Sequence, residues 1–305
     1  MTIAVVITLF ASFLWAITNH IDKYMLCKID SSTSNVKTLL LFSSFVAGIV
    51  LSPVWLLISM FQIQISILSL VFVFGAAILY ILATYFYFKA LEKNDASIVV
   101  VMFQLIPVFS YVFSLIFFKE VLSIKEIIGA LIIISSAIII SFDFGKTSNK
   151  NKLVALLYMT TSSLLYSLYF ICFDFAMRNG EYNAVAFWYQ IGLLLVGICL
   201  ISIKSFRTDF KKMIKNNGRK IISLNITNEV INLIANLMVN FANLIIPLAL
   251  ANTLNGFQGA FCFIIGTIGV MLFPKFFNED LSKKNVIQKV SCIVLGIIGL
   301  IVMFM

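Results

Sequence analysis

Six asparagines and one glutamate recur at steps of three and four in Asn225-Ile-Thr-Asn228-Glu229-Val-Ile-Asn232-Leu-Ile-Ala-Asn236-Leu-Met-Val-Asn240-Phe-Ala-Asn243. On an α-helix these seven side chains fall within an arc of about 120°. The other positions are mostly Ile, Leu and Val, and the stretch covers about 27 Å, close to the apolar thickness of a bilayer. The pattern predicts one membrane helix with a polar stripe. Because such a stripe is costly against lipid, it must face other helices or water.

The composition of the whole chain is that of a helical membrane protein. Of 305 residues, 61% are hydrophobic and only 11% are charged, and the mean hydropathy is +1.06. The net charge of +9 is explained by lysines at the cytoplasmic ends of helices, so we expect no nucleic-acid partner. The five cysteines are scattered without ligand spacing, which argues against a disulfide framework and against a metal site.

Apolar segments of membrane-spanning length fill nearly all of the chain. The first has no basic region and no cleavage site, so it is not expected to be a signal peptide. The connections are short, which leaves no soluble domain. Ten segments are predicted: Thr2–Asn19, Thr38–Met60, Ser66–Phe88, Ala96–Phe118, Ile124–Phe142, Leu153–Phe173, Ala184–Ile203, Ile221–Ile245, Pro247–Phe273 and Val286–Phe304.

A basic interruption at Gly145–Lys152 divides these segments into five plus five. The halves, residues 1–145 and 150–305, then read in parallel. Phe118-Lys-Glu120-Val-Leu-Ser123 follows the fourth segment and Phe277-Asn-Glu279-Asp-Leu-Ser282 follows the ninth, each before a glycine-containing apolar helix. A repeat with an odd number of helices must be inverted in the membrane. The predicted fold is therefore an all-α membrane protein of ten transmembrane helices in two inverted five-helix repeats, the plan of secondary transporters.

At this level the sequence resembles the drug/metabolite transporter superfamily, specifically its EamA-type ten-helix transporters, over essentially the whole chain. The resemblance rests on apolar, degenerate motifs, so it implies an architecture and a transport function but no particular solute. The chain departs from the family pattern by lacking a ninth-helix proline and by its richer asparagine stripe. The motifs are Trp15-Ala16, Lys23, Gln104–Pro107, Phe118–Ser123 leading to Gly129, Leu153–Leu165 and Phe273–Ser282.

Charge and resemblance disagree about orientation. Of the 22 Lys and Arg residues, all but Lys119, Lys125 and Arg178 lie in odd-numbered connections. The positive-inside rule puts those connections in the cytoplasm and both termini outside, whereas the family resemblance implies termini inside. We follow the charge bias, and we expect the protein in the cytoplasmic (inner) membrane.

Glu229 is the one acidic residue well inside an apolar segment. A carboxyl group there could exchange protons near neutral pH or pair with a cationic solute; it could also reach interfacial water from its place two turns into the helix. Asn228, Asn232, Asn236 and Asn240 could replace the hydration shell of a solute, or they could join helices by hydrogen bonds. Six such residues on one arc favour a water-filled passage over a helix–helix packing interface.

Further candidate solute contacts lie on other segments. Asn255 and Gln258 continue the polar surface on the ninth segment, and Gln104, near Pro107, is their first-half counterpart. Tyr80, Tyr166 and Trp15 could stack on a solute or attract a cation, although core packing explains such residues equally well.

For several other polar and aromatic residues near helix ends we expect a structural role and not a functional one. Tyr87 and Tyr169 are expected in interfacial aromatic belts. Asp22, Asp174 and the lone His20 are expected to contact water at helix ends.

No enzyme site, metal site or cofactor site can be assembled from this sequence. The leading hypothesis is a secondary transporter that moves a small polar, amine-bearing or zwitterionic metabolite by alternating access, with Glu229 as its proton-coupling group. The expected partners are that solute and membrane lipids, and a homodimer remains open. The alternatives are a flippase for a lipid-linked headgroup and a non-transporting membrane scaffold or sensor.

Overall fold

The computed structural model describes residues 2–28, 35–118, 123–141, 149–177, 180–243, 245–246, 254–277 and 279–304, and within these ranges it contains helices and connections but no strand. The helices are α1 (Thr2–Lys28), α2 (Asn35–Val46), η1 (Ala47–Leu51), α3 (Ser52–Ile58), α4 (Ile67–Lys93), α5 (Ala96–Met102), α6 (Leu105–Phe118), α7 (Ile124–Ser141), α8 (Asn149–Met177), α9 (Tyr182–Ser202), α10 (Lys204–Asn243), α12 (Gln258–Leu272) and α13 (Lys283–Phe304).

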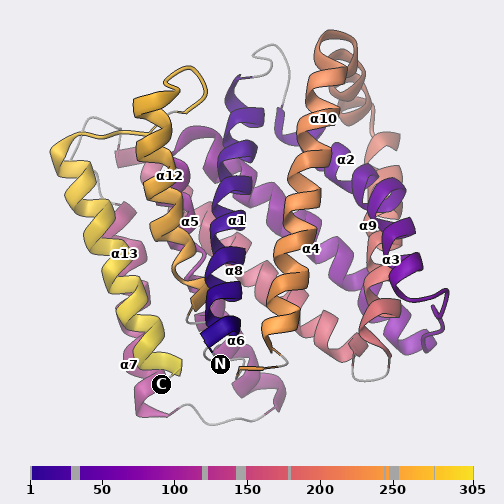
Figure 1. Ribbon diagram of the computed structural model, residues 1–305, viewed down its shortest axis with the longest axis horizontal. Coiled ribbons are helices and arrows are strands. Elements are labelled where there is room, and N and C mark those ends of the chain that lie inside the picture. Colours follow the sequence, from indigo (N-terminus) through magenta and orange to yellow (C-terminus); the bar gives the residue numbers. More distant parts are fainter. Residues whose placement is uncertain are drawn as a thin grey trace.

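The helices run side by side as one bundle (Figure 1). Among the described residues, eight helical spans are long and apolar enough to cross a membrane, and α12 is a shorter apolar helix. The strongest packing joins α4 to α8, α7 to α13, and α1 to α10. The prediction of an all-helical membrane protein is confirmed. The full set of ten crossings and the inverted relation of the two halves stay predictions.

The predicted fourth segment is broken into α5 and α6 at Phe103 and Gln104, just before Pro107. Proline cannot donate to the carbonyl four residues earlier, so the backbone bond that should reach Phe103 is missing. Instead Ile106 N–H donates to the Phe103 carbonyl at 2.9 Å. The Met102 carbonyl, which would accept from Ile106 N–H in an unbroken helix, accepts from the Ser163 hydroxyl of α8 at 3.4 Å instead. A neighbouring helix thus supplies a hydrogen bond that the break removes, as membrane proteins require.

The lysine-rich link Lys204–Lys220, expected as a connection, is helical and merges with the asparagine helix in α10. The two parts meet at Asn217, whose φ of −138° is not helical. The first part carries apolar residues at i, i+4 and i+7, which predicts an amphipathic helix lying on the end of the bundle. One of them, Phe210, packs on Phe42 of α2 with ring centroids 4.7 Å apart.

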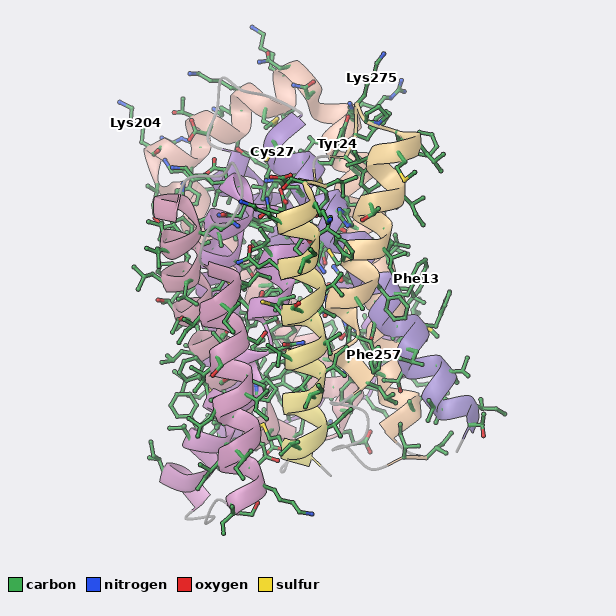
Figure 2. The ribbon with its side chains drawn as sticks, turned by 90° about the vertical axis from the view of Figure 1, so that its left-hand side faces the viewer. Phe13, Tyr24, Cys27, Lys204, Phe257 and Lys275 are labelled. Atoms are coloured by element: carbon green, nitrogen blue, oxygen red, sulfur yellow. The ribbon has the colours of Figure 1, made fainter. Side chains whose placement is uncertain are left out.

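Basic residues gather at one end of the bundle. Lys204 and Lys275 lie at the same end as Tyr24 and Cys27 of α1 (Figure 2). Both chain termini lie at the opposite end (Figure 1). We call these the lysine-rich end and the terminal end.

Gly129 of α7 allows the closest approach of two helices. A Cβ atom at Gly129 would lie 2.7 Å from the carbonyl oxygen of Gly299 and 2.7 Å from the backbone nitrogen of Met303, both on α13. Backbone cannot retreat as a side chain can, so we expect Gly129→Ala to destabilise the protein by about 1–3 kcal/mol. The matched control is Gly75→Ala in α4, where no atom lies within 4 Å; it should be neutral or slightly stabilising. Equal apparent Tm values for the two variants in detergent would contradict this contact.

Candidate functional site

A cavity of about 470 Å³ lies between α1, α2, α3, α4, α8, α9 and α10. Six of the predicted solute contacts line it together, although they come from four helices and are far apart in sequence. They are Trp15, Tyr80, Tyr166, Glu229, Asn232 and Asn236.

The cavity runs from the middle of the bundle toward the terminal end. Its lining begins at Ser43 and Glu229 and continues to Trp55, Met177 and Tyr182, at the ends of α3 and α8 and the start of α9. Along α10 the polar stripe follows the same direction, with Asn225 and Asn228 buried and Asn236 exposed. The cavity therefore has one closed end, at Glu229, and one end facing the side of the chain termini.

Aromatic rings form the wall opposite the polar stripe. The Tyr80 ring packs edge-on against Tyr166 at 5.7 Å, Tyr169 at 5.6 Å and Tyr189 at 5.9 Å between centroids. The Tyr166 hydroxyl lies 3.0 Å from the Thr84 hydroxyl, which ties α8 to α4. Tyr169, expected in an interfacial belt, instead lines the cavity. Mutual packing holds these rings in place, so the wall is pre-formed.

A polar layer seals the closed end of the cavity. Asn228 donates to one oxygen of Asp22 at 2.8 Å, and the Tyr87 hydroxyl lies 3.1 Å from the other oxygen and 2.8 Å from Asn19 Oδ1. In the same layer, the Ser43 hydroxyl interacts with Glu229 and with the Asn225 amide. The layer joins α1, α2, α4 and α10 at the level where the cavity stops.

Two of these positions correct the sequence expectations. Asp22 is buried rather than hydrated at a helix end, because α1 extends to Lys28 and places it within the bundle. Tyr87 is buried against it and is not part of an interfacial belt. His20 is likewise buried, with Nε2 2.8 Å from the Cys262 carbonyl oxygen. Asp174 is exposed at the cavity rim, as expected.

Three further predicted contacts, Gln104, Asn255 and Gln258, are not among the lining residues of the cavity. Gln104 faces α13 at Gly296 and reaches the Gly256 carbonyl at 3.5 Å. Asn255 accepts a hydrogen bond from Ser12 at 3.3 Å, which ties the ninth segment to α1. Gln258 begins α12. The side chain of Asn240 lies outside the described residues, and so does Glu120 of the first-half motif.

Sequence reasoning missed other polar and aromatic cavity residues, among them Ser43, Trp55, Tyr189 and Gln190. In the described part of the chain, Trp55 Nε1 and Gln190 Oε1 are buried without a hydrogen-bond partner. Buried polar atoms are normally paired, so these two indicate that the cavity is built for polar contents. The one sequence signal was the occurrence of tryptophan and glutamine inside apolar segments.

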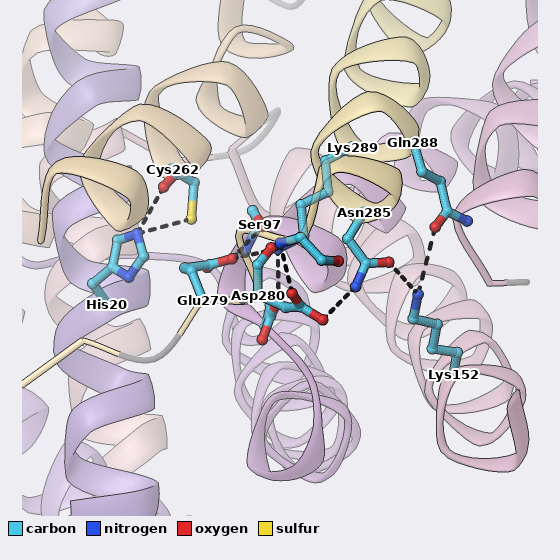
Figure 3. A network of polar contacts seen from close by, with 11 residues as sticks. His20, Ser97, Lys152, Cys262, Glu279, Asp280, Asn285, Gln288 and Lys289 are labelled. Atoms are coloured by element: carbon cyan, nitrogen blue, oxygen red, sulfur yellow. Dashed lines mark hydrogen bonds and ion pairs between the residues drawn. The ribbon is translucent and has the colours of Figure 1, made fainter. Parts of the chain in front are cut away.

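The second-half motif contributes Glu279 and Asp280 to a separate, largely buried network around Lys289, which we call the ionic latch (Figure 3). Lys289 of α13 reaches Glu279 at 2.7 Å and Asp95, just before α5, at 2.5 Å. Glu279 also accepts from the Ser97 hydroxyl at 2.8 Å. Although burial acts the other way, hydrogen bonds from Ser282 and Asn285 lower the pKa of Asp280. The latch joins the two halves of the chain at the lysine-rich end.

Comparison with known proteins relates the first part of the chain to a family of transporters. Residues 2–142 match the EamA-like transporter family, which confirms the predicted resemblance to the drug/metabolite transporter superfamily. Several solved structures share the fold. One, described only as "Crystal structure of protein", has a TM-score of 0.52 and 17% sequence identity over 97% of this chain and 94% of its own. No curated protein sequence matches. The family match and the apolar helices support a membrane transporter of the drug/metabolite superfamily, a family of transporters and not of enzymes.

Proposed function

We propose that the protein is a secondary transporter that moves a small polar, amine-bearing or zwitterionic metabolite through the cavity by alternating access. The observation that carries this proposal is the position of Glu229 at the closed end of a cavity that otherwise offers amides, hydroxyls and aromatic rings, with Asp174 at its exposed rim. A carboxyl group at the closed end suits a cationic group of a solute, or a proton that exchanges with it.

The cavity wall supports this class of solute. Its volume of about 470 Å³ lies within the range of small-molecule sites. Asn232 and Asn236 offer donors and acceptors, and Tyr80 offers both a hydroxyl and a ring that attracts cations. No Lys or Arg is among the lining residues. The balance favours a positively charged or zwitterionic solute over a phosphate.

Alternating access requires one open side and one closed side. The cavity extends toward the terminal end, whereas the polar layer at Asp22 and the ionic latch close the lysine-rich end. With the lysine-rich end in the cytoplasm, as the charge bias indicates, this arrangement corresponds to an outward-facing state. The termini would then lie outside.

Orientation has its own test. A reporter enzyme that is active only in the cytoplasm should stay inactive when fused after Met305. The same reporter inserted in the first part of α10, near Lys212, should be active. The reverse pattern would place the termini in the cytoplasm, and the observed arrangement would then be an inward-facing state.

Transport itself is tested with the purified full chain in proteoliposomes. A panel of labelled amines and amino acids should include at least one solute whose uptake depends on the protein and on an imposed pH gradient. Uptake equal to that of protein-free liposomes for the whole panel would contradict the proposal.

One observation favours a second candidate, a flippase for a lipid-linked headgroup. A mostly apolar groove of about 780 Å³ lies between α1, α10 and α12 near Arg219 and Lys220. An acyl chain would fit such a lateral groove, with its headgroup at the basic residues. Protein-dependent movement of a labelled lipid between leaflets, without uptake of any soluble amine, would favour this candidate.

A further inference from the structure

The polar layer at the closed end of the cavity carries more oxygen atoms than its own hydrogen bonds use. Asn225 and Asn228 are only 1% and 2% exposed. Within the described part of the chain, the side-chain oxygen of each accepts no hydrogen bond. Leaving a buried acceptor unpaired costs about 1–3 kcal/mol. Two such unpaired amide oxygens in one layer indicate a bound species that oxygen atoms can coordinate or that donates hydrogen bonds to them.

The Asp22 carboxylate is the charged group of this layer. Both of its oxygens meet neutral donors, Asn228 Nδ2 at 2.8 Å and the Tyr87 hydroxyl at 3.1 Å. Among the described residues, no Lys, Arg or His forms an ion pair with Asp22: the neighbouring Lys23 donates instead to the Leu91 carbonyl at 2.6 Å. A buried carboxylate without a positive partner is expensive, so a cation belongs in this layer.

The arrangement of the layer places these atoms together. Asn228 Nδ2 donates to Asp22, so the amide group that carries the unpaired oxygen is in direct contact with the carboxylate. The Asn225 amide and Glu229 both meet the Ser43 hydroxyl, and Asp22 and Glu229 interact electrostatically. The facing groups are thus Asp22 from α1, Ser43 from α2, Tyr87 from α4, and Asn225, Asn228 and Glu229 from α10.

We propose that this layer binds Na⁺, with Asp22 as its charged ligand and the amide oxygens of Asn225 and Asn228 as neutral ligands. Hard cations prefer carboxylate, amide and hydroxyl oxygens. A proton would satisfy the carboxylate but would leave both amide oxygens unpaired. One or two carboxylates match a single positive charge better than a double one, and the described residues contain no group of three or more acidic, His or Cys side chains arranged for a metal ion.

This inference rests on the proposed function for its meaning, because Na⁺ would be a second coupling ion beside the proton exchanged at Glu229. Bound Na⁺ would hold α1 and α10 together through Asp22 and Asn228, next to the solute site at Glu229. Release of the ion would leave the Asp22 charge uncompensated and favour opening of the layer toward the lysine-rich end. Binding itself can be measured without any transport.

The test is the thermal unfolding of the purified full chain in detergent, followed by the fluorescence of its three tryptophans. NaCl is titrated against N-methyl-D-glucamine chloride at constant ionic strength, with KCl as a second comparison. We expect Na⁺ to raise Tm by about 3 °C or more at saturation. Asp22→Asn should lose this rise. Asn225→Leu should weaken it about 10-fold in midpoint, since it removes one neutral ligand.

The matched control is Glu92→Gln, which makes the same carboxyl-to-amide change at a partly exposed i,i+3 pair with Lys89 and should respond to Na⁺ as the wild type does. Identical wild-type Tm values in all three salts would overturn the inference. So would an unchanged response in Asn225→Leu, which remains informative where Asp22→Asn fails to fold. A Na⁺ response without solute uptake would support the cation site and contradict the proposed transport. Solute uptake without a Na⁺ response would support transport and contradict the cation site.

Discussion

Glu229→Gln is expected to reduce uptake of an amine-bearing solute about 100-fold and to remove its dependence on pH. The carboxyl group lies at the closed end of the cavity, where water is scarce and a charge-assisted contact is strong. Losing a buried pair with a cationic group costs about 3–5 kcal/mol, more than enough for this factor. Glutamine keeps the size and the hydrogen bond to Ser43, so folding should be preserved.

The measurement is the initial uptake rate in proteoliposomes at acidic and neutral pH, for wild type, Glu229→Gln and Glu92→Gln. The groups that interact electrostatically with Glu229 are Asp22 from α1, Tyr80 from α4 and Tyr166 from α8. They stay intact in all three proteins. If Glu229→Gln takes up the solute at the wild-type rate with an unchanged pH profile, Glu229 is not the group that binds the solute or exchanges the proton.

Lys289→Met should produce the largest loss of stability, about 3–5 kcal/mol, or about 10 °C in apparent Tm. The lysine side chain is 1% exposed and is paired with Glu279, which is also 1% exposed, and with Asp95. Removing the lysine leaves two carboxylates in the interior without their positive partner. The ionic latch joins the two halves, so its loss should also weaken closure at the lysine-rich end.

A second variant separates lost charge balance from lost packing. Lys289→Met combined with Glu279→Gln removes one charge of each sign and should recover part of the Tm lost by the single variant. The control is Lys284→Met at an exposed position of the same helix. A Tm for Lys289→Met equal to that of Lys284→Met would show that the latch does not stabilise the protein.

The parts of the fold that could be predicted from the sequence are those governed by local periodicity and hydrophobic length. The polar arc of Asn232 and Asn236 indicated which face of the eighth segment meets a cavity, because helical spacing fixes the face of each residue. Apolar length indicated where the spans lie. The helix at Lys204–Asn217 was not predicted because its many charged residues made the segment resemble a connection, although it has an apolar face.

The rest of the site depends on contacts between distant segments. Asp22 and Tyr87 appeared to be interfacial because each lies near the end of an apolar run; only the packing of α1, α4 and α10 shows that they meet. Ser43 has no local pattern that marks it, and Gln190 stands out only as a polar residue within an apolar segment. Asn255 is a further example, since the contact of its side-chain oxygen with Ser12 of α1 depends on two segments far apart in the sequence.

The direct test of the central claim, that the cavity is a wet passage ending at Glu229, is the reactivity of single cysteines along α10. In a cysteine-free background, Asn232→Cys and Asn236→Cys should react with a polar thiol reagent added at the terminal end. Asn225→Cys, beyond the closed end, and Ile234→Cys, on the outer face of the same helix, should react much more slowly. Protection at both cavity positions would show a packed seam instead of a passage and would contradict the account.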